Sequence, residues 1–372
     1  MLTKKKLKLG ILGCGAISSE YLKGMMEVYS DVVEVVACSD VIIEKAKERA
    51  SGYNVPKVYS PEELMNDPEI DIIANLTVPA VHEDLTIACL QHGKHVYTEK
   101  PLATTRFGAK RILDTANSLG LRVGCAPDTF MNAPSQTAKK AIEDGWIGEP
   151  IGVTAICPMR GNEFWRSDPD FFYKKGGGPM LDNAPYWLNI MVSLMGTIKS
   201  VAAKARITFP ERTIKVHPRR GEKIQVEVPT FVSGVFEFET GAIGTFINSF
   251  DIWKSKTPFI EIYGEKGSLV FPDSPGLYNG EVLISRLGDP QWHSYPILNE
   301  YGKFTRGIGI ADMVRGILTD TPHRASMELA YHVTDVMLSF EESAEEGITK
   351  MISSKCNKPE GLWTTEDSIL WK

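Results

Sequence analysis

A lysine between a carboxylate and a proline, Glu99-Lys100-Pro101, is the part of this chain best suited to move a proton. The tripeptide closes the β-like run from His95 to Thr98, and the proline ring restricts the turn that holds the lysine. A lysine that lies beside a bound cationic ring, partly shielded from water, has a lowered ammonium pKa and can accept a hydroxyl proton. The tripeptide therefore predicts acid–base chemistry next to a redox cofactor.

A glycine turn, Gly13-Cys14-Gly15, supplies the place for that cofactor. Apolar residues alternate with others over 7–11 before the turn and recur at helical spacing over 17–25 after it, which predicts strand, turn and helix. Glycines at such a turn let the backbone approach a pyrophosphate at a helix N-terminus. The third glycine of the dinucleotide fingerprint is replaced by Ser18, which is still small. We therefore expect a dinucleotide to contact Gly13, Gly15, Ala16 and Ile17.

Asp40 indicates which dinucleotide is bound. It follows a second apolar run, 32–38, near the ~20-residue offset of the fingerprint acid. A carboxylate there accepts hydrogen bonds from the ribose hydroxyls and repels a 2′-phosphate. The next residues are Val41, Ile42 and Ile43, without an arginine, although Lys45 and Lys47 follow closely. The sequence favours NAD over NADP.

Strands alternate with helices through the first third of the chain, which predicts a doubly wound parallel α/β sheet of the Rossmann type. Beyond the first two strands, the expected strands are 57–59, 71–77, 96–98 and 121–125. After a linking helix, 136–142, the pattern becomes strand-rich and carries one long helical region, 179–195. This part predicts an α+β C-terminal domain with a large mixed or antiparallel open sheet. The expected domains are residues 1–126 and 127–372, with a final helix, 329–342, packing back on the first.

Composition excludes several classes of function. A chain of 372 residues with 43% hydrophobic and 24% charged residues is typical of a globular protein with two domains. A net charge of −6 without a basic stripe argues against a nucleic-acid partner, and no apolar stretch is long enough to span a membrane. Six scattered cysteines predict reduced thiols in a cytoplasmic protein, and neither they nor His323 and His332 show metal-ligand spacing. We expect no metal site.

These motifs together resemble the Gfo/Idh/MocA oxidoreductases, the family named for glucose–fructose oxidoreductase and inositol dehydrogenase. The resemblance runs from about residue 6 to about residue 345, and the Glu-Lys-Pro element with the downstream glycine run is its most specific part. The elements that carry it are Gly10–Ile17, Thr77-Val78-Pro79 with His82, Gly93–Val96 with Glu99-Lys100-Pro101, and Gly176-Gly177-Gly178 with Asp182. The family implies a nicotinamide cofactor, redox chemistry at a hydroxyl carbon of a sugar or cyclitol, and a C-terminal sheet used for substrate binding and oligomerisation.

The resemblance also implies roles for single residues. Thr77, Pro79 and His82 follow the fourth strand and would line the cofactor side of the cleft, and Glu99 would contact the nicotinamide ribose. Lys100 would be the proton acceptor or donor.

The motif of the second domain departs from the family pattern, because Tyr186 stands where most members carry a histidine four residues after Asp182. A spacing of four predicts that both side chains share one helix face. Tyr186 could relay the proton to Lys100, or it could only hydrogen-bond the substrate. Asn189, one turn on, stands where many members carry an acid.

Other polar and aromatic residues are candidates for substrate binding. A carbohydrate is commonly held by an aromatic face together with amides and carboxylates, although a domain-linking loop has a similar composition. The candidates are Asp128, Asn162, Glu163, Trp165 and Tyr173, with Asn189.

The expected function is NAD-dependent hydride transfer at a hydroxyl carbon of a sugar, glycoside or cyclitol. Two alternatives remain open: a glycosidase that uses NAD for transient oxidation, and a non-catalytic regulator that binds NAD and a sugar. Apolar residues on both faces of 231–238 predict a homodimer or homotetramer packed through the second sheet.

Overall fold

The computed structural model describes residues 6–272, 280–297, 305–363 and 367. The chain divides into two compact units. The first comprises Met1–Ala133, Asn299–Tyr331 and Pro359–Lys372, and the second comprises Pro134–Leu298 and His332–Lys358. None of the described helices is long and apolar enough to cross a membrane.

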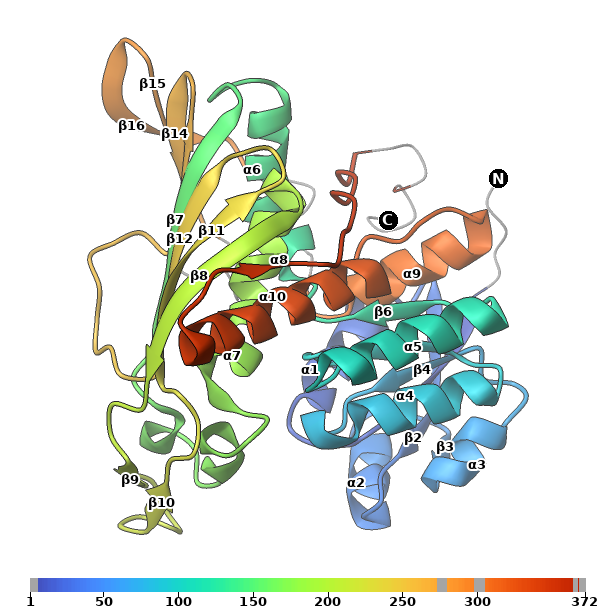
Figure 1. The fold of residues 1–372 in the computed structure, drawn as a ribbon. Coiled ribbons are helices and arrows are strands. Elements are labelled where there is room, and N and C mark those ends of the chain that lie inside the picture. Colours follow the sequence, from blue (N-terminus) through green and yellow to red (C-terminus); the bar gives the residue numbers. More distant parts are fainter. Residues whose placement is uncertain (1–5, 273–279, 298–304, 364–366, 368–372) are drawn as a thin grey trace. The chain divides into compact units, whose positions relative to one another are not determined.

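The first unit contains a six-stranded parallel sheet (Figure 1). Its strands lie in the order β3-β2-β1-β4-β5-β6, so the order reverses between β1 and β4, where open α/β sheets bind their ligands. The strands are β1 Leu7–Leu12, β2 Val33–Ser39, β3 Lys57–Tyr59, β4 Ile72–Asn75, β5 His95–Thr98 and β6 Val123–Cys125. All four residues of β4 are buried, as expected for a strand covered by helices on both faces.

Helices connect these strands and bury the sheet. They are α1 Ser18–Lys23, the π-helix Gly24–Val28, α2 Ile43–Tyr53, α3 Pro61–Asn66, α4 His82–Gln91, α5 Arg106–Leu119 and, from the later segment, α9 Ile308–Thr319. Short 3-10 turns lie at Pro79–Val81 and Thr129–Met131. α3 begins with a capping box, in which the side chains of Ser60 and Glu63 bond each other's backbone N–H, and Pro61 is the first helical residue.

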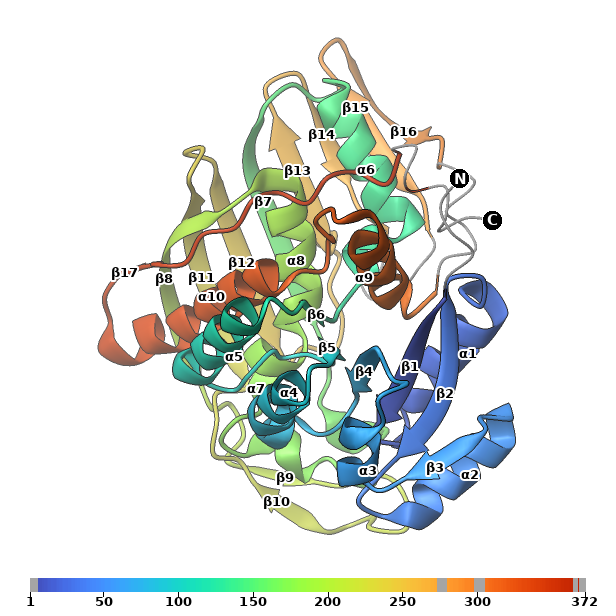
Figure 2. The same cartoon turned by 90° about the vertical axis from the view of Figure 1, so that its right-hand side faces the viewer.

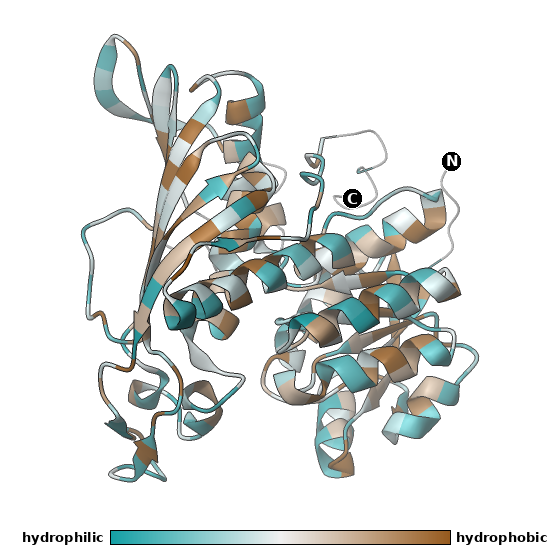
Figure 3. Cartoon of the chain, viewed as in Figure 1, coloured by the Kyte–Doolittle hydropathy of each residue, from teal (hydrophilic) through white to brown (hydrophobic). Residues whose placement is uncertain are grey.

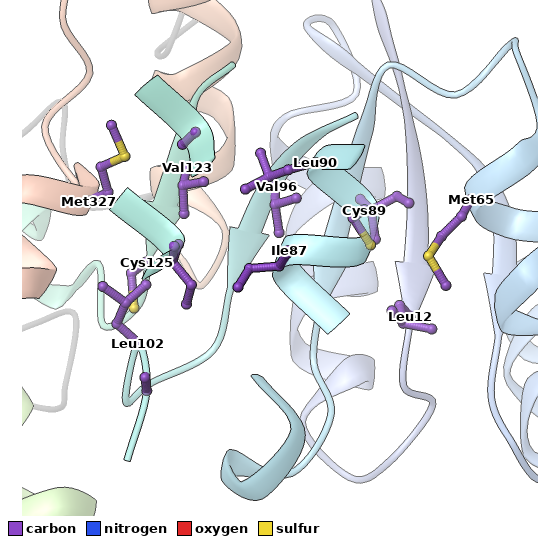
Figure 4. Close-up of a cluster of buried hydrophobic side chains, with 14 of the residues drawn as sticks. Leu12, Met65, Ile87, Cys89, Leu90, Val96, Leu102, Val123, Cys125 and Met327 are labelled. Carbon is purple, nitrogen blue, oxygen red and sulfur yellow. The ribbon is translucent and has the colours of Figure 1, made fainter. Parts of the chain in front are cut away.

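One hydrophobic cluster lies between this sheet and α4 and α5 (Figure 4). Leu12, Val96 and Val123 contribute from three strands, and Ile87 and Leu90 contribute from α4. Met327 and Ala330, from the start of α10 (Met327–Glu346), complete the cluster. The first turn of this helix therefore belongs to the core of the first unit.

The second unit is built on a nine-stranded sheet (Figure 2). Its order is β16-β15-β14-β13-β7-β12-β11-β8-β17, and only the β7–β12 pair is parallel. The strands are β7 Pro150–Pro158, β8 Ile198–Arg206, β11 Phe231–Phe238, β12 Ile243–Ser249, β13 Ile260–Gly264, β14 Gly267–Val270, β15 Val282–Arg286, β16 Asp289–Tyr295 and β17 Lys350–Met351. Two short strands, β9 Glu211–Thr213 and β10 Lys223–Gln225, form a separate ribbon.

Helices α6 (Ala133–Glu143) and α8 (Ala184–Met195) lie along one face of this sheet (Figure 1). Brown and pale bands alternate along its strands, as expected where one face is covered (Figure 3). Phe236 is buried and contacts Phe340 of α10 edge-on, whereas Val235 is 48% exposed. The fold class predicted from the sequence, a Rossmann unit plus an open mixed sheet, is confirmed.

The long helix predicted over 179–195 is interrupted. It forms α7, Gly178–Asp182, and α8, with Asn183 between them. Pro185 accounts for the break, because it has no N–H to bond the carbonyl of Leu181 four residues back and its ring clashes with that carbonyl. Asp182 and Tyr186 thus stand on two helices separated by Asn183, and their position on a shared face stays a prediction.

Candidate active site

The glycine turn has the backbone geometry that the fingerprint predicts. Gly13 has a φ of +97°, and a Cβ there would lie 2.8 Å from the carbonyl carbon of Leu76. Only glycine therefore fits between the ends of β1 and β4. A Cβ on Gly15 would meet nothing within 4 Å, and Ala16 is exposed, so the second half of the turn faces open space that can accept a phosphate group.

Asp40 ties the glycine turn to the end of β2. Its Oδ2 accepts a hydrogen bond from the Cys14 backbone N–H at 2.8 Å, and its Oδ1 accepts one from the Ile42 N–H at 2.9 Å. Val41 is 86% exposed beside it, which leaves an apolar surface suited to an adenine ring. A turn with open space, a carboxylate and an apolar surface fits an adenine dinucleotide.

Arg49 is a further residue at the glycine turn that the sequence did not predict. It lies in the last turns of α2, and its Nη2 donates to the Gly15 carbonyl at 3.2 Å. Helix α2 runs back along the sheet and so brings the Arg49 side chain to the glycine turn, a contact that the local sequence spacing does not predict.

Glu99 anchors the turn that carries Lys100. Its Oε1 accepts hydrogen bonds from the Tyr21 hydroxyl and from Nη1 of Arg306, both at 2.9 Å, and its Oε2 accepts one from the Lys100 N–H at 3.0 Å. Burial by itself would raise the pKa of Glu99, but Arg306 and Lys100 keep it below its usual value. The carboxylate therefore stays charged and fixes the backbone at Lys100.

His82 is buried and joins the two loops that were assigned to the cofactor. Nδ1 lies 2.8 Å from the Pro101 carbonyl oxygen, and Nε2 lies 3.0 Å from that of Thr77. Burial lowers the pKa of His82, so the neutral ring donates to one of these oxygens. Thr77 is held further by its hydroxyl, which donates to Asn75 Oδ1 at 2.6 Å.

Lys100 lies at the carboxyl edge of the sheet. Asn75 pairs with Thr98 across β4 and β5, so Thr77 and Lys100 each follow a paired position by two residues. Pro79 begins the 3-10 turn between them and α4. The first unit thus brings Gly13, Thr77, Pro79, His82, Glu99 and Lys100 to one edge.

Asp128 has a structural partner that was not expected. Its Oδ2 accepts hydrogen bonds from the backbone N–H groups of Gly307, at 2.8 Å, and Gly309, at 3.1 Å. It therefore holds the start of α9, a helix that sequence reasoning did not predict. A substrate role for Asp128 stays a prediction.

In the second unit, Glu163 belongs to a buried network. It accepts a hydrogen bond from the Tyr173 hydroxyl and forms an ion pair with Arg212, whose Nη1 lies 3.0 Å away. Arg212 also pairs with Asp251. Trp165 is 54% exposed nearby in the chain, and Asn162 is fully buried.

The remaining predicted residues of the second unit lie on α7 and α8. Asp182 ends α7, and Tyr186 lies in the first turn of α8, both half-buried. Asn189 is buried, and its Nδ2 donates to the Pro185 carbonyl at 2.8 Å. Within the described residues, no group of three His, Cys, Asp or Glu side chains could hold a metal ion.

Comparison with known proteins agrees with this architecture. Residues 7–126 match the model of an oxidoreductase family with an NAD-binding Rossmann fold, and residues 135–270 match the GFO/IDH/MocA C-terminal domain. The trans-1,2-dihydrobenzene-1,2-diol dehydrogenase of Xenopus laevis is 36% identical over 243 residues, 64% of this chain and 73% of that protein. The myo-inositol 2-dehydrogenase of Thermotoga maritima is 24% identical over 271 residues, 72% of this chain and 75% of that protein.

A solved structure shows the same fold over nearly the whole chain. It is an NAD-binding oxidoreductase from Klebsiella pneumoniae with a TM-score of 0.83 and 23% identity, and the match covers 94% of this chain and 100% of that one. Together with the glycine turn and the Glu-Lys-Pro edge, these matches identify the chain as an NAD-binding oxidoreductase that belongs to the GFO/IDH/MocA family.

Proposed function

We propose that the protein transfers a hydride between a hydroxyl-bearing carbon of a sugar, glycoside or cyclitol and NAD, with Lys100 moving the proton. The relatives named for myo-inositol and dihydrodiol oxidation support this class of substrate. The observation that carries the proposal is the edge of the first sheet, where Gly13, Thr77 and Lys100 follow three adjacent strands.

Each residue of this edge has a task that follows from its contacts. The bound nicotinamide supplies the hydride acceptor or donor. Glu99 and His82 hold the backbone on both sides of Lys100. The Lys100 amine takes the hydroxyl proton when the substrate is oxidised and returns it when the carbonyl is reduced.

The preference for NAD over NADP is part of the proposal. The carboxylate of Asp40 stands at the end of β2, where a 2′-phosphate would meet its negative charge. Arg49, whose Nη2 donates to the Gly15 carbonyl, adds a positive charge beside the turn that acts against this preference.

Assignments in the second unit are also part of the proposal. Asp182 and Tyr186 are proposed as catalytic partners, with Tyr186 as relay or substrate donor. We further propose a reducing, cytoplasmic setting, because all six cysteines are free thiols and five of them are buried.

The test is a spectrophotometric screen of NAD⁺ reduction with free sugars, cyclitols and glycosides. The proposal predicts NADH formation with at least one polyol. Hydrolysis of a glycoside without net NADH would instead favour the glycosidase. Binding of NAD and a sugar with neither reaction would favour the non-catalytic regulator.

A further inference from the structure

The loop that follows β7 in the second unit carries two guanidinium groups without a carboxylate partner. Arg160 and Arg166 are half-buried, and the described part of the chain offers neither of them an ion pair or a side-chain hydrogen bond. Each packs on aromatic rings instead: the Arg160 Cζ lies 4.1 Å from the Trp253 ring centroid, and the Arg166 Cζ lies 4.9 Å from that of Trp165. These cation–π contacts stabilise the two guanidinium groups, but they give the N–H donors no hydrogen-bond acceptor.

The guanidinium of Arg160 is fixed in position by three aromatic rings. Phe164 and Phe209 add ring contacts, with centroids 5.1 and 5.5 Å from its Cζ. The Nε of Arg160 is buried and has no hydrogen-bond partner among the described residues. Its two terminal nitrogens, Nη1 and Nη2, also make no hydrogen bond with these residues, but they are accessible to solvent. A planar fork fixed in this way matches a carboxylate or a phosphate.

The two nearby carboxylates share the single positive charge of Arg212, so their excess charge stabilises Arg160, but neither of them hydrogen-bonds to its guanidinium. Asp251 forms a backbone bridge with Arg160, but its side chain pairs with Arg212 and accepts a hydrogen bond from Thr230 at 2.8 Å. Glu163 is engaged by Arg212 and by a tyrosine hydroxyl. The fork of Arg160 is thus left for an anion from outside the chain.

Asn162 gives an independent sign that a polar ligand enters here. Its side chain is fully buried, yet neither Nδ2 nor Oδ1 has a hydrogen-bond partner. A buried amide with both atoms unused costs roughly 1–3 kcal/mol, unless a ligand or water supplies the missing bonds. Of the rings that contact Arg160, Trp253 is 70% exposed and Phe209 is 42% exposed, so broad ring surfaces remain uncovered.

We propose that Arg160, Asn162 and Trp253 form a subsite for an acidic carbohydrate, a sugar or cyclitol that carries a carboxylate or a phosphate. The oxyanion accepts hydrogen bonds from the Arg160 fork, hydroxyl groups exchange hydrogen bonds with the Asn162 amide, and the sugar ring lies on Trp253. This inference rests on the proposed function for its substrate class, but the binding step needs neither cofactor nor turnover.

The test is calorimetric titration of the full chain, without cofactor, with four probes. These are D-glucuronate, D-glucose 6-phosphate, D-glucose and inorganic phosphate. The subsite predicts that at least one acidic sugar binds roughly tenfold or more tightly than both glucose and phosphate alone. The two acidic probes distinguish a carboxylate from a phosphate as the preferred group.

Variants then locate the binding. Arg160→Gln is expected to weaken the binding of the acidic sugar roughly 10- to 100-fold. Arg160→Lys keeps the charge without the planar fork, so its affinity should lie between those of Arg160→Gln and the parent protein. Arg206→Gln is the matched control, because Arg206 ends β8 as an exposed arginine of the same unit. Trp253→Ala, at an exposed position, gives a second test that does not depend on Arg160.

Three results would overturn the inference. They are equal affinity for acidic and neutral sugar, unchanged binding in both Arg160→Gln and Trp253→Ala, and no binding of either acidic probe up to ~10 mM. The same experiments distinguish failure of the subsite from failure of the proposed oxidoreductase function. Tight acidic-sugar binding without any NAD⁺ reduction would leave the subsite intact and remove the oxidoreductase reaction.

Discussion

At the scale of single residues, the turn at Lys100 is held by partners that the local sequence does not reveal. Glu99 is bonded by Tyr21 and Arg306, which come from α1 and from the segment before α9. His82 reaches the Pro101 carbonyl from the start of α4. The tripeptide and the glycine turn could be predicted, because each is a short motif. Their supports could not, because they come from distant parts of the chain.

Asp40 gives the first prediction. Asp40→Ala removes the carboxylate that repels a 2′-phosphate, so the preference for NAD over NADP should shrink by roughly tenfold or more. Titration of both cofactors by fluorescence quenching measures this. Equal affinities in the parent protein would contradict the assignment, and Glu44→Ala, an exposed acid on α2, serves as control.

The second prediction concerns His82. His82→Ala removes a buried ring that lies between the Thr77 and Pro101 carbonyls and donates to one of them, so turnover should fall roughly 10- to 100-fold through misplacement of Lys100. The expected loss of stability is about 1–3 kcal/mol. Steady-state kinetics and thermal unfolding measure the two effects, with the exposed His92→Ala as control. Turnover equal to that of the parent would show that the ring does not position Lys100.

At the scale of elements, the buried strands were predictable and the exposed ones were not. β11, Phe231–Phe238, has the predicted bounds, because apolar residues occupy both of its faces and Val232, Phe236 and Phe238 are buried. β16, Asp289–Tyr295, was missed, since almost all of its residues are exposed and polar and only pairing with β15 makes it a strand. Helix α9 was also not predicted, because the residue that holds its start, Asp128, lies far away in the sequence.

His332 in α10 provides a test at this scale. Its Nε2 accepts a hydrogen bond from the Ile198 N–H at 3.0 Å, and its Nδ1 lies 2.9 Å from the Ser354 hydroxyl. The ring must be neutral to accept, and burial lowers its pKa to about 4. Because the unfolded chain binds the proton more readily, with a pKa of ~6.5, this contribution is complete above that pH and is lost as pH falls through 4.

His332→Gln should therefore flatten the loss of stability between about pH 6.5 and 4, by up to about 3 kcal/mol. Chemical unfolding at a series of pH values measures it. The exposed His92→Gln should leave the slope as it is in the parent. The same slope in His332→Gln and parent would show that the buried ring does not titrate as described.

At the scale of the whole molecule, one face of the second sheet leaves apolar side chains uncovered. Ile151, Val235 and Ile243 are 56%, 48% and 58% exposed, and a groove between the strands is lined by Thr154, Val235 and Ile247. Single molecules rarely expose a contiguous apolar surface of this kind. The prediction of a homodimer or homotetramer through this sheet therefore stands as a proposal.

Val235→Glu should shift the protein toward a monomer, because it places a charge in the centre of that surface. Light scattering at micromolar concentration measures the mass. Leu119→Glu is the control, since Leu119 is also 48% exposed but ends α5 of the first unit. A monomeric parent protein would contradict the prediction.

The most direct test of the account is the Lys100→Met variant, with NAD binding and turnover measured on the same sample. If Lys100 carries the proton, turnover should fall by roughly 10²–10⁴, because that is the usual contribution of a positioned acid–base group. NAD affinity should stay within about threefold of the parent, since the glycine turn and Asp40 are untouched. Near-normal turnover in Lys100→Met would contradict the central claim, and the non-catalytic regulator would then become the better explanation of the site.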